Sequence, residues 1–207
     1  MKTEYLKISP GSPEEERINR VVEALSNGGL VVLPTETVYG IGFDLESDIA
    51  LNKIGAVKKE RDAKPYTVCI PDSNWLSNYD IEEESRRNFS LIEDLMPGPI
   101  TVVMAVKGRG KLGFRMPADN ITRQVVYAFS KPIGLSSANL SYQIPARGAQ
   151  EAIDYLWGAV DLIVDGGSPV FCVPSLVLEL SLNPVEILRA GPPFVTEEVK
   201  KRLKGSG

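Results

Sequence analysis

Hydrophobic positions recur along the chain with two periods, and these predict which segments are helices and which are strands. The segment "SPEEERINRVVEALSNGG" places Val21 and Leu25 on one helical face. Ser12 is the expected N-cap of this helix, with a capping box completed by Glu15, and Gly28 is its expected stop. The N-terminal region is therefore predicted to contain one amphipathic helix.

Helical and extended patterns then alternate to the end of the chain. Helices are predicted over residues 47–57, 85–97, 120–130, 149–158 and 195–203. Strands are predicted over residues 30–33, 66–70, 99–106, 113–117, 132–137 and 161–165, followed by a hairpin of 175–180 and 185–190. The alternation indicates an α/β fold with a twisted, open, mixed β-sheet flanked by helices, in a single domain over residues 1–207.

Composition and charge exclude several kinds of function. The 207 residues contain no histidine, so Ser-His catalysis and a protein-built metal site are not expected. A net charge of −4 argues against bulk binding to nucleic acid, although a local basic groove stays open. Short apolar runs, two cysteines without motif spacing and a charged N-terminus predict a cytoplasmic protein without a membrane partner.

Hydroxyl and cationic side chains gather after the predicted strands. The strand in "VVLPTETVYGIG" leads to Thr35, "SSANLS" supplies Ser137 and Asn139, and the hairpin supplies Ser175 and Arg189. Taken alone, the Thr-Glu-Thr run is typical of a turn, and the cations of "KKERDAK" are typical of a solvated helix end. Ligands of open α/β sheets bind beyond the carboxyl ends of strands. The joint placement therefore favours a site for a small polar ligand beside a phosphorylated one.

The order of these segments resembles the YrdC/YciO family. "LPTETVYGIG", a basic segment ending in "KP", "MPGPITVVM", "FRMP", "SSANLS", "DLIVDGG", "PSLVLEL" and "LRAG" carry the resemblance from about Val31 to Gly191. Its best-known members are L-threonylcarbamoyladenylate synthases, nucleotidyltransferases that join L-threonine, bicarbonate and ATP into threonylcarbamoyl-AMP and release pyrophosphate. The product serves threonylcarbamoyladenosine modification at position 37 of tRNA. The resemblance implies a stand-alone YrdC-like domain, with Mg²⁺ arriving on ATP and held mainly by phosphate oxygens.

The resemblance also implies roles for individual residues. It assigns threonine binding to Thr35, Arg115, Ser137 and Ser175. It assigns ATP binding to Lys58, Arg61, Lys64, Thr101, Asn139, Arg147 and Arg189, with Lys58 and Arg61 also catalytic. The register of "KKERDAKP" leaves open whether Lys58 or Lys59 anchors the phosphate, and Arg147 is equally a phosphate contact or an exposed charge.

Other functions stay open at this point. The segment "YLKISPGSPEEERINRVVEAL" is similar to the YciO branch of the family, which suggests an enzyme that hydrolyses an acyl-adenylate. A second alternative is a module that binds double-stranded RNA or tRNA, although only 7% of the residues are aromatic. The synthase reading further implies a downstream threonylcarbamoyl transferase as a partner.

Overall fold

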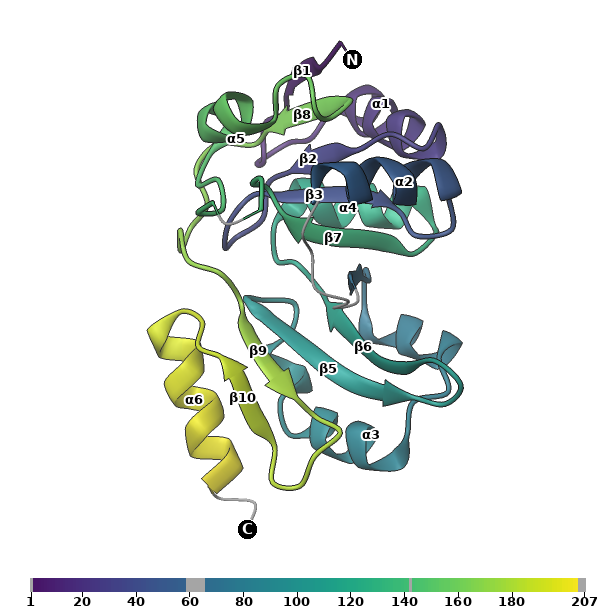
Figure 1. The fold of residues 1–207 in the computed structure, drawn as a ribbon. Coiled ribbons are helices and arrows are strands. Elements are labelled where there is room, and N and C mark those ends of the chain that lie inside the picture. The colour runs from purple at the N-terminus through teal and green to yellow at the C-terminus, as the bar shows by residue number, and fades with distance from the viewer. Residues whose placement is uncertain (1, 59–65, 142, 205–207) are drawn as a thin grey trace. The chain divides into compact units, whose positions relative to one another are not determined.

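The computed structural model describes residues 2–58, 66–141 and 143–204 of the chain (Figure 1). It divides into two compact units, each assembled from two stretches of sequence. Unit 1 comprises Met1–Lys64 and Asp119–Cys172, and unit 2 comprises Pro65–Ala118 and Val173–Gly207. The expectation of one domain over residues 1–207 stays a prediction, and each unit is described by itself.

Unit 1 contains a mixed sheet whose strand order is β1-β8-β2-β3-β7. Strand β8 runs parallel to both β1 and β2, and β3 is antiparallel to β2 and β7. The strands are β1 (Glu4–Lys7), β2 (Val31–Leu33), β3 (Gly40–Asp44), β7 (Ile133–Ser137) and β8 (Leu162–Asp165). The helices are α1 (Glu15–Ser26), α2 (Asp48–Val57), α4 (Asn120–Phe129) and α5 (Ala149–Leu156).

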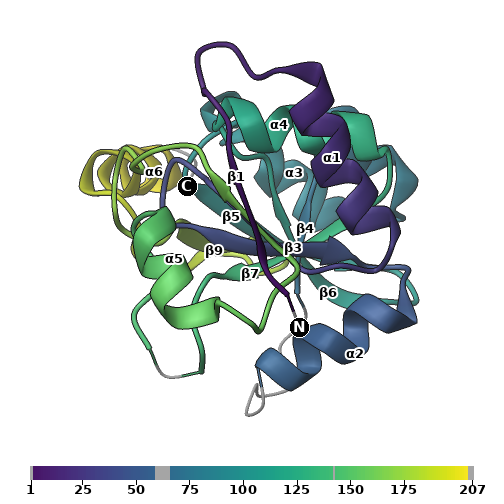
Figure 2. The same ribbon diagram turned by 90° about the horizontal axis from the view of Figure 1, so that it is seen from above.

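The helices of unit 1 cover both faces of its sheet. Figure 2 shows α1 and α4 on one face and α2 and α5 on the other. The buried side chains of α4 include Ile121 and Val125, and those of α1 include Val21 and Leu25, as the helical period predicts. Because both faces are covered, β2 and β3 are buried along their whole length.

The ends of two helices test the predicted caps. The cap prediction at Ser12 is wrong, because α1 begins at Glu15 with Glu14 as its N-cap and no capping side chain. Helix α2 begins where predicted, and the Ser47 hydroxyl accepts a 3.3 Å hydrogen bond from the N–H of Ala50. Residue type alone therefore did not locate the first helix start, since several polar residues precede it.

Two strands of unit 1, β1 and β3, were not predicted from the sequence. Strand β3 contains Gly40 and Gly42, which carry no side-chain pattern. Both glycines are needed for close packing: a Cβ at Gly40 would lie 2.7 Å from Leu135 Cδ1, and one at Gly42 would lie 2.9 Å from Leu33 Cδ1. The glycines of this segment are typical of a turn, whereas in the structure it is a buried strand that pairs with β2.

The strands of unit 2 follow the order β4-β6-β5-β9-β10 and are also of mixed direction. Strand β6 is parallel to β4 and antiparallel to β5, and β5 is parallel to β9. The strands are β4 (Thr67–Cys69), β5 (Ile100–Val106), β6 (Gly110–Arg115), β9 (Leu176–Glu179) and β10 (Glu186–Arg189). The helices are α3 (Glu83–Ser90), α6 (Pro193–Lys204) and two 3-10 helices, Ser73–Asn78 and Glu93–Leu95.

The predicted C-terminal hairpin is confirmed, because β9 and β10 are antiparallel. The predicted helix over 85–97 ends early at Ser90, and a 3-10 turn follows. In both units the sheet is mixed and helices flank it, which confirms the predicted α/β class. Across the parts of the chain that the structure describes, no helix has the length and apolar character to cross a membrane.

Candidate functional site

The loop after β2 carries the first predicted site residue, Thr35, in unit 1. Its hydroxyl donates to the carbonyl of Val38 at 2.6 Å and accepts from the N–H of Thr37 at 3.2 Å. The Thr37 hydroxyl lies 2.9 Å from it, and Thr35 is only 2% exposed. These contacts are the turn chemistry that the Thr-Glu-Thr run predicts, and they fix the Thr35 side chain within its own loop.

Helix α4 supports this loop through two residues that the sequence did not single out. The Thr122 hydroxyl donates to the carbonyl of Pro34 at 2.5 Å. Asp119 caps α4 by accepting from the N–H of Thr122 at 3.0 Å. Burial, followed by the charge of the buried Glu36, raises the pKa of Asp119 to about 6. The spacing of Asp119 and Thr122 is an N-cap signature, so the cap, though not its position beside the loop, was readable from sequence.

Tyr39 ends the same loop and has a structural role. It is fully buried, and its hydroxyl donates to the carbonyl of Gly167 at 2.7 Å and accepts from the N–H of Gly166 at 3.2 Å. Burial raises the pKa of this phenol. Tyr39 therefore connects β3 to the segment after β8 and stays protonated at neutral pH.

A second polar group in unit 1 joins the end of α2 to the end of β7. The buried ammonium of Lys58 donates to the carbonyls of Ser137 at 2.8 Å and Asn139 at 2.5 Å, and to Asn139 Oδ1 at 3.0 Å. The Ser137 hydroxyl donates to the same Oδ1 at 2.5 Å. The structure thus brings Lys58 together with Ser137 and Asn139, which lie 79 and 81 positions further along the sequence.

Unit 2 contains the second cluster of predicted residues. The hydroxyls of Thr101 and Ser175 lie 2.9 Å apart. Arg189 donates from Nε to the carbonyl of Ser175 at 3.0 Å and from a terminal nitrogen to its hydroxyl at 3.1 Å. Arg115, which is buried, is paired with Thr101 across the β5–β6 ladder. All four predicted residues of unit 2 therefore belong to one group.

The charge of this group favours an anion. Desolvation, and after it the positive charge of Arg115, lowers the pKa of Arg189. Two guanidinium groups that repel each other are stabilised when an anion accepts hydrogen bonds from both. The neighbouring hydroxyls of Thr101 and Ser175 add neutral donors and acceptors. The group is thus suited to a carboxylate or a phosphate.

The remaining predicted residues lie elsewhere. Arg61 and Lys64, together with Lys59, fall outside the described residues. Arg147 is exposed, and its backbone N–H donates to the Glu151 carboxylate at 2.8 Å, so its side chain stays a prediction in either of its two roles. Among the described residues no group of histidine, cysteine, aspartate and glutamate is arranged to hold a metal ion.

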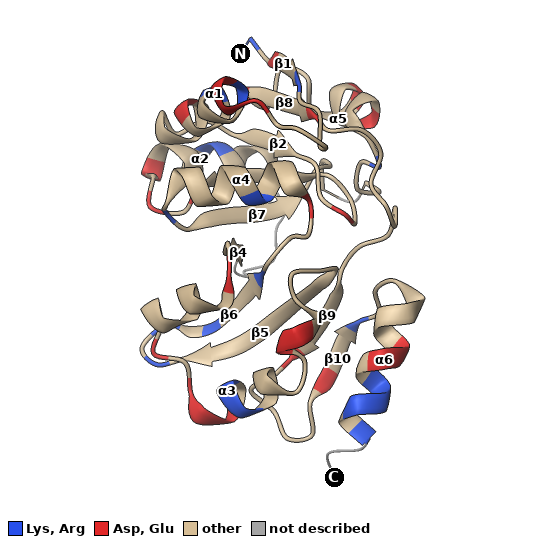
Figure 3. Ribbon diagram, turned by 180° about the vertical axis from the view of Figure 1, so that it is seen from behind, with Lys and Arg blue, Asp and Glu red and all other residues tan. Residues whose placement is uncertain are grey.

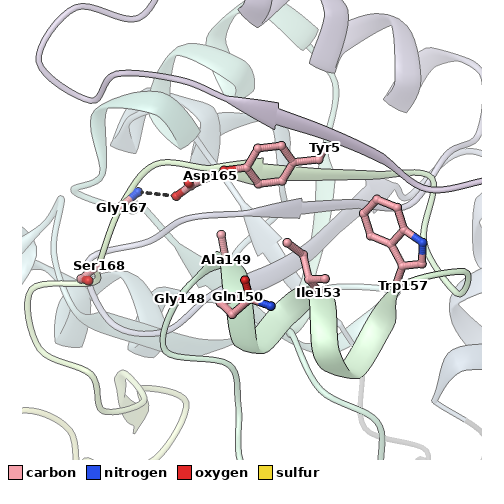
Figure 4. Close-up of a pocket in the computed structure, with 9 residues that line it drawn as sticks. All are labelled: Tyr5, Gly148, Ala149, Gln150, Ile153, Trp157, Asp165, Gly167 and Ser168. Carbon is pink, nitrogen blue, oxygen red and sulfur yellow. Dashed lines mark hydrogen bonds between the residues drawn. The ribbon is translucent and has the colours of Figure 1, made fainter.

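A pocket of about 690 Å³ lies in unit 1, between the β1 and β8 strands and α5 (Figure 4). Its walls include the rings of Tyr5 and Trp157, and the Tyr5 hydroxyl donates to Asp165 at 2.6 Å. Of the predicted site residues that the structure describes, none lines it. This pocket and the predicted chemistry therefore lie at different places in unit 1.

In both units, strands of mixed direction are flanked by helices, which defines an α/β protein. Hydroxyl and cationic side chains are hydrogen-bonded to one another near the strand ends of each unit. Residues 23–191 match the model of the family Sua5_yciO_yrdC, described as "Telomere recombination". The chain belongs to the Sua5/YciO/YrdC family, as the sequence resemblance predicted.

Similar proteins include both branches of this family. The chain is 31% identical over 194 residues to the Threonylcarbamoyl-AMP synthase of Mus musculus, covering 84% of this chain and 68% of that protein. P. abyssi Sua5, solved in complex with L-threonine, superposes with a TM-score of 0.88 at 28% identity, covering 97% of this chain and 61% of that one. E. coli YciO superposes with a TM-score of 0.80 at 25% identity, covering 91% and 96%. The chain thus spans less than two thirds of the Sua5 chain and nearly all of the YciO chain.

Proposed function

We propose that this chain is a threonylcarbamoyl-AMP synthase, a nucleotidyltransferase that uses L-threonine, bicarbonate and ATP. The observation that carries the proposal is the similarity to a synthase at 31% identity and to a Sua5 chain solved with L-threonine. The presence of an anion-suited group of two arginines and two hydroxyls supports it.

The proposed chemistry needs positioning rather than a protein nucleophile. The threonine amine and bicarbonate form a carbamate with loss of water. A carbamate oxygen then attacks the α-phosphorus of ATP, and the bond to pyrophosphate breaks. Holding the reactants and neutralising the developing negative charge are what the protein must supply. A chain that lacks histidine is compatible with such a reaction.

We assign the roles residue by residue. In unit 1, Thr35 and Ser137 would bind threonine, and Asn139 and Arg147 would bind ATP. In unit 2, Arg115 and Ser175 would bind threonine, and Thr101 and Arg189 would bind ATP. Arg61 and Lys64 would bind the phosphates, with Mg²⁺ arriving on ATP. The contacts of Lys58 with Ser137 and Asn139 favour a role other than the expected phosphate contact.

The test is a mass-spectrometric search for a carbamoyl-adenylate after incubation with ATP, Mg²⁺, bicarbonate and each amino acid in turn. We expect threonylcarbamoyl-AMP and pyrophosphate only when threonine and bicarbonate are both present. Arg115→Gln should abolish product, while Arg109→Gln, which removes an exposed arginine near the Tyr79 ring, should not. ATP turnover that ignores threonine, or that yields ADP, would contradict the proposal.

The same experiment addresses the hydrolase alternative. An enzyme of the YciO type acting on an acyl-adenylate would release AMP from added threonylcarbamoyl-AMP without forming it from ATP. We expect net synthesis when pyrophosphate is removed by a pyrophosphatase. Release of AMP alone, with no synthesis under those conditions, would favour the hydrolase.

The surface charge gives limited support to an RNA-binding role. Figure 3 shows Lys and Arg positions in blue along the C-terminal half of α6, following acidic positions of the same helix. Lys200 is paired with Glu197, and Arg202 with Glu198 and Asp94. Ion pairs reduce the charge that is offered to a phosphate backbone. Binding of tRNA and transfer of the product to a separate threonylcarbamoyl transferase are accordingly proposed only as later steps.

A further inference from the structure

The ammonium group of Lys58 is surrounded by oxygens of a single short segment. Three acceptors, the Ser137 carbonyl, the Asn139 carbonyl and Asn139 Oδ1, lie 2.5–3.0 Å from Nζ. A lysine ammonium has three hydrogens, and each of these oxygens can accept one of them. Lys58 is also only 8% exposed. Burying a charge is costly unless polar groups compensate it, and here the compensation comes from the 137–139 segment.

The side-chain amide of Asn139 has one orientation that satisfies all its neighbours. Its Nδ2 donates to the carbonyls of Leu140 and Gln143, each at 2.8 Å. Its Oδ1 accepts from Lys58 and from the Ser137 hydroxyl. A flipped amide would direct an N–H group at the ammonium and its oxygen at two carbonyls. Lys58 therefore sets the orientation of Asn139, and Asn139 in turn is hydrogen-bonded to the carbonyls of Leu140 and Gln143.

This arrangement determines how Ser137 can meet a ligand. The one hydrogen of its hydroxyl is donated to Asn139 Oδ1 at 2.5 Å. The capacity that Ser137 can offer a ligand is then that of an acceptor. An amine or a hydroxyl of the substrate can donate to it, whereas a carboxylate cannot. Ser137 would thus recognise the donor end of an amino acid.

We infer that Lys58 is a positioning residue, which acts through Asn139 to fix the Ser137 hydroxyl as an acceptor facing the substrate. The inference rests on the proposed function for its kinetic consequence but not for its structural one. Lys58 follows the last residue of α2 directly, and its N–H donates to the carbonyl of Ile54 at 2.9 Å. The positive charge at the C-terminal end of α2 also interacts favourably with the helix dipole. Lys58 thereby connects the C-terminal end of α2 to the segment that follows β7.

The structural consequence is tested by hydrogen exchange, followed by mass spectrometry, on the peptide spanning residues 136–146. In Lys58→Met, which keeps the apolar stem, we expect amide exchange in this peptide to speed up about tenfold or more, because the segment loses its central donor. The matched control is Lys53→Met on the same helix, whose ammonium pairs with Asp161 at 3.1 Å. The control should leave exchange in this peptide unchanged. Unchanged exchange in Lys58→Met would overturn the inference.

The kinetic consequence is tested on the same variants. We expect kcat of Lys58→Met to fall about tenfold or more and KM for ATP to rise by a smaller factor, because Lys58 acts on the nucleotide only through Asn139, which is proposed to bind ATP. In Lys58→Ala, ammonium ions should restore part of kcat by occupying the oxygens, and tetramethylammonium should not. A large rise in KM for ATP without rescue would make Lys58 a phosphate contact and overturn the inference.

Two further outcomes are distinguishable. If wild-type protein makes no adenylate with any amino acid, the proposed function fails while the exchange experiment still tests the role of Lys58. If Lys58→Met does not fold, Asn139→Ala removes the shared acceptor instead. Faster exchange in 136–146 is then expected, and unchanged exchange would again overturn the inference.

Discussion

The Thr35 hydroxyl makes several hydrogen bonds within its own loop. It donates to the Val38 carbonyl and lies within hydrogen-bond distance of the Thr37 N–H and hydroxyl. A hydroxyl used in this way shapes the loop, and the proposed contact with threonine would have to share or replace one of these bonds. Folding and binding are therefore both expected to depend on this single oxygen.

We predict that Thr35→Val lowers the free energy of unfolding by about 1 kcal/mol and weakens threonine binding about tenfold to a hundredfold. The methyl group leaves both the loop and the substrate's polar group without a partner. ATP binding measured without threonine should barely change. Calorimetric titration of each ligand, with a thermal melt, measures the two effects, and Thr35→Ser is the matched control. A melt that shifts while threonine affinity does not would leave Thr35 with a structural role only.

Asp119 provides a pH dependence at the same loop. Its folded pKa of about 6 lies above the ordinary value, because burial and then the charge of Glu36 disfavour its ionised form. Between about pH 4 and pH 6 the folded state holds a proton that the unfolded state has lost. The resulting stability is present below pH 4 and is lost as the pH rises through 6.

We predict that Asp119→Asn removes this loss and keeps the cap, since an amide oxygen can also accept from the N–H of Thr122. Relative to wild type, the variant should be more stable at pH 7 than at pH 4 by roughly 1–3 kcal/mol. Urea unfolding at a series of pH values gives the difference. A wild-type-minus-variant curve that is flat between pH 4 and pH 7 would contradict the prediction.

The β9–β10 hairpin is the element that presents Ser175 and Arg189. Ser175 directly precedes β9 and Arg189 ends β10, so the antiparallel pairing brings them within hydrogen-bond distance. Gly191, which follows β10, packs closely against the start of β9. A Cβ added at Gly191 would lie 2.2 Å from the backbone nitrogen of Leu176. Only a residue without a side chain allows this approach.

We predict that Gly191→Ala forces the two strands apart at this end and lowers the free energy of unfolding by about 1–3 kcal/mol or more. The anion-suited group should lose its geometry as well, because Ser175 is adjacent to the displaced backbone. Gly11→Ala is the matched control, since nothing lies within 4 Å of the added carbon. Equal melting temperatures for the two variants would show that the hairpin tolerates the clash.

The division into two units is a property of the whole molecule that follows from chain topology. Unit 2 needs the C-terminal stretch, because β5 is paired along Ile100–Val103 with β9 from the far end of the sequence. Unit 1 receives no strand from beyond Cys172. The two units therefore depend differently on the last 35 residues.

We predict that a chain ending at Cys172 keeps unit 1 protected from hydrogen exchange and loses protection throughout unit 2. The edge of β5 would be left without its parallel partner, which also favours aggregation. Exchange measured peptide by peptide reports on each unit separately, with the full chain as the reference. Loss of protection in both units would show that unit 1 is not stable without unit 2.

The spacing of apolar residues along the chain was sufficient to predict most of the helices and strands. Helices α2, α4 and α5 and strands β5, β7 and β8 lie where the sequence predicts them, because their apolar spacing reflects the face that each buries. The glycine-rich β3 was not predicted, since Gly40 and Gly42 interrupt the side-chain pattern of a short strand. The motifs also gave the family, because turn residues and hydroxyls at fixed offsets are local features.

The orientation of the polar groups was decided by tertiary structure alone. The sequence placed Lys58 in a basic segment and predicted a phosphate contact. The fold brings oxygens of Ser137 and Asn139 around its ammonium, and the phosphate contact stays a prediction. A hydrogen bond depends on distance and angle between groups that are remote in sequence, and no local pattern encodes them. The sequence by itself determined the α/β class and the family, and only the fold decided which of the predicted side chains are hydrogen-bonded to one another.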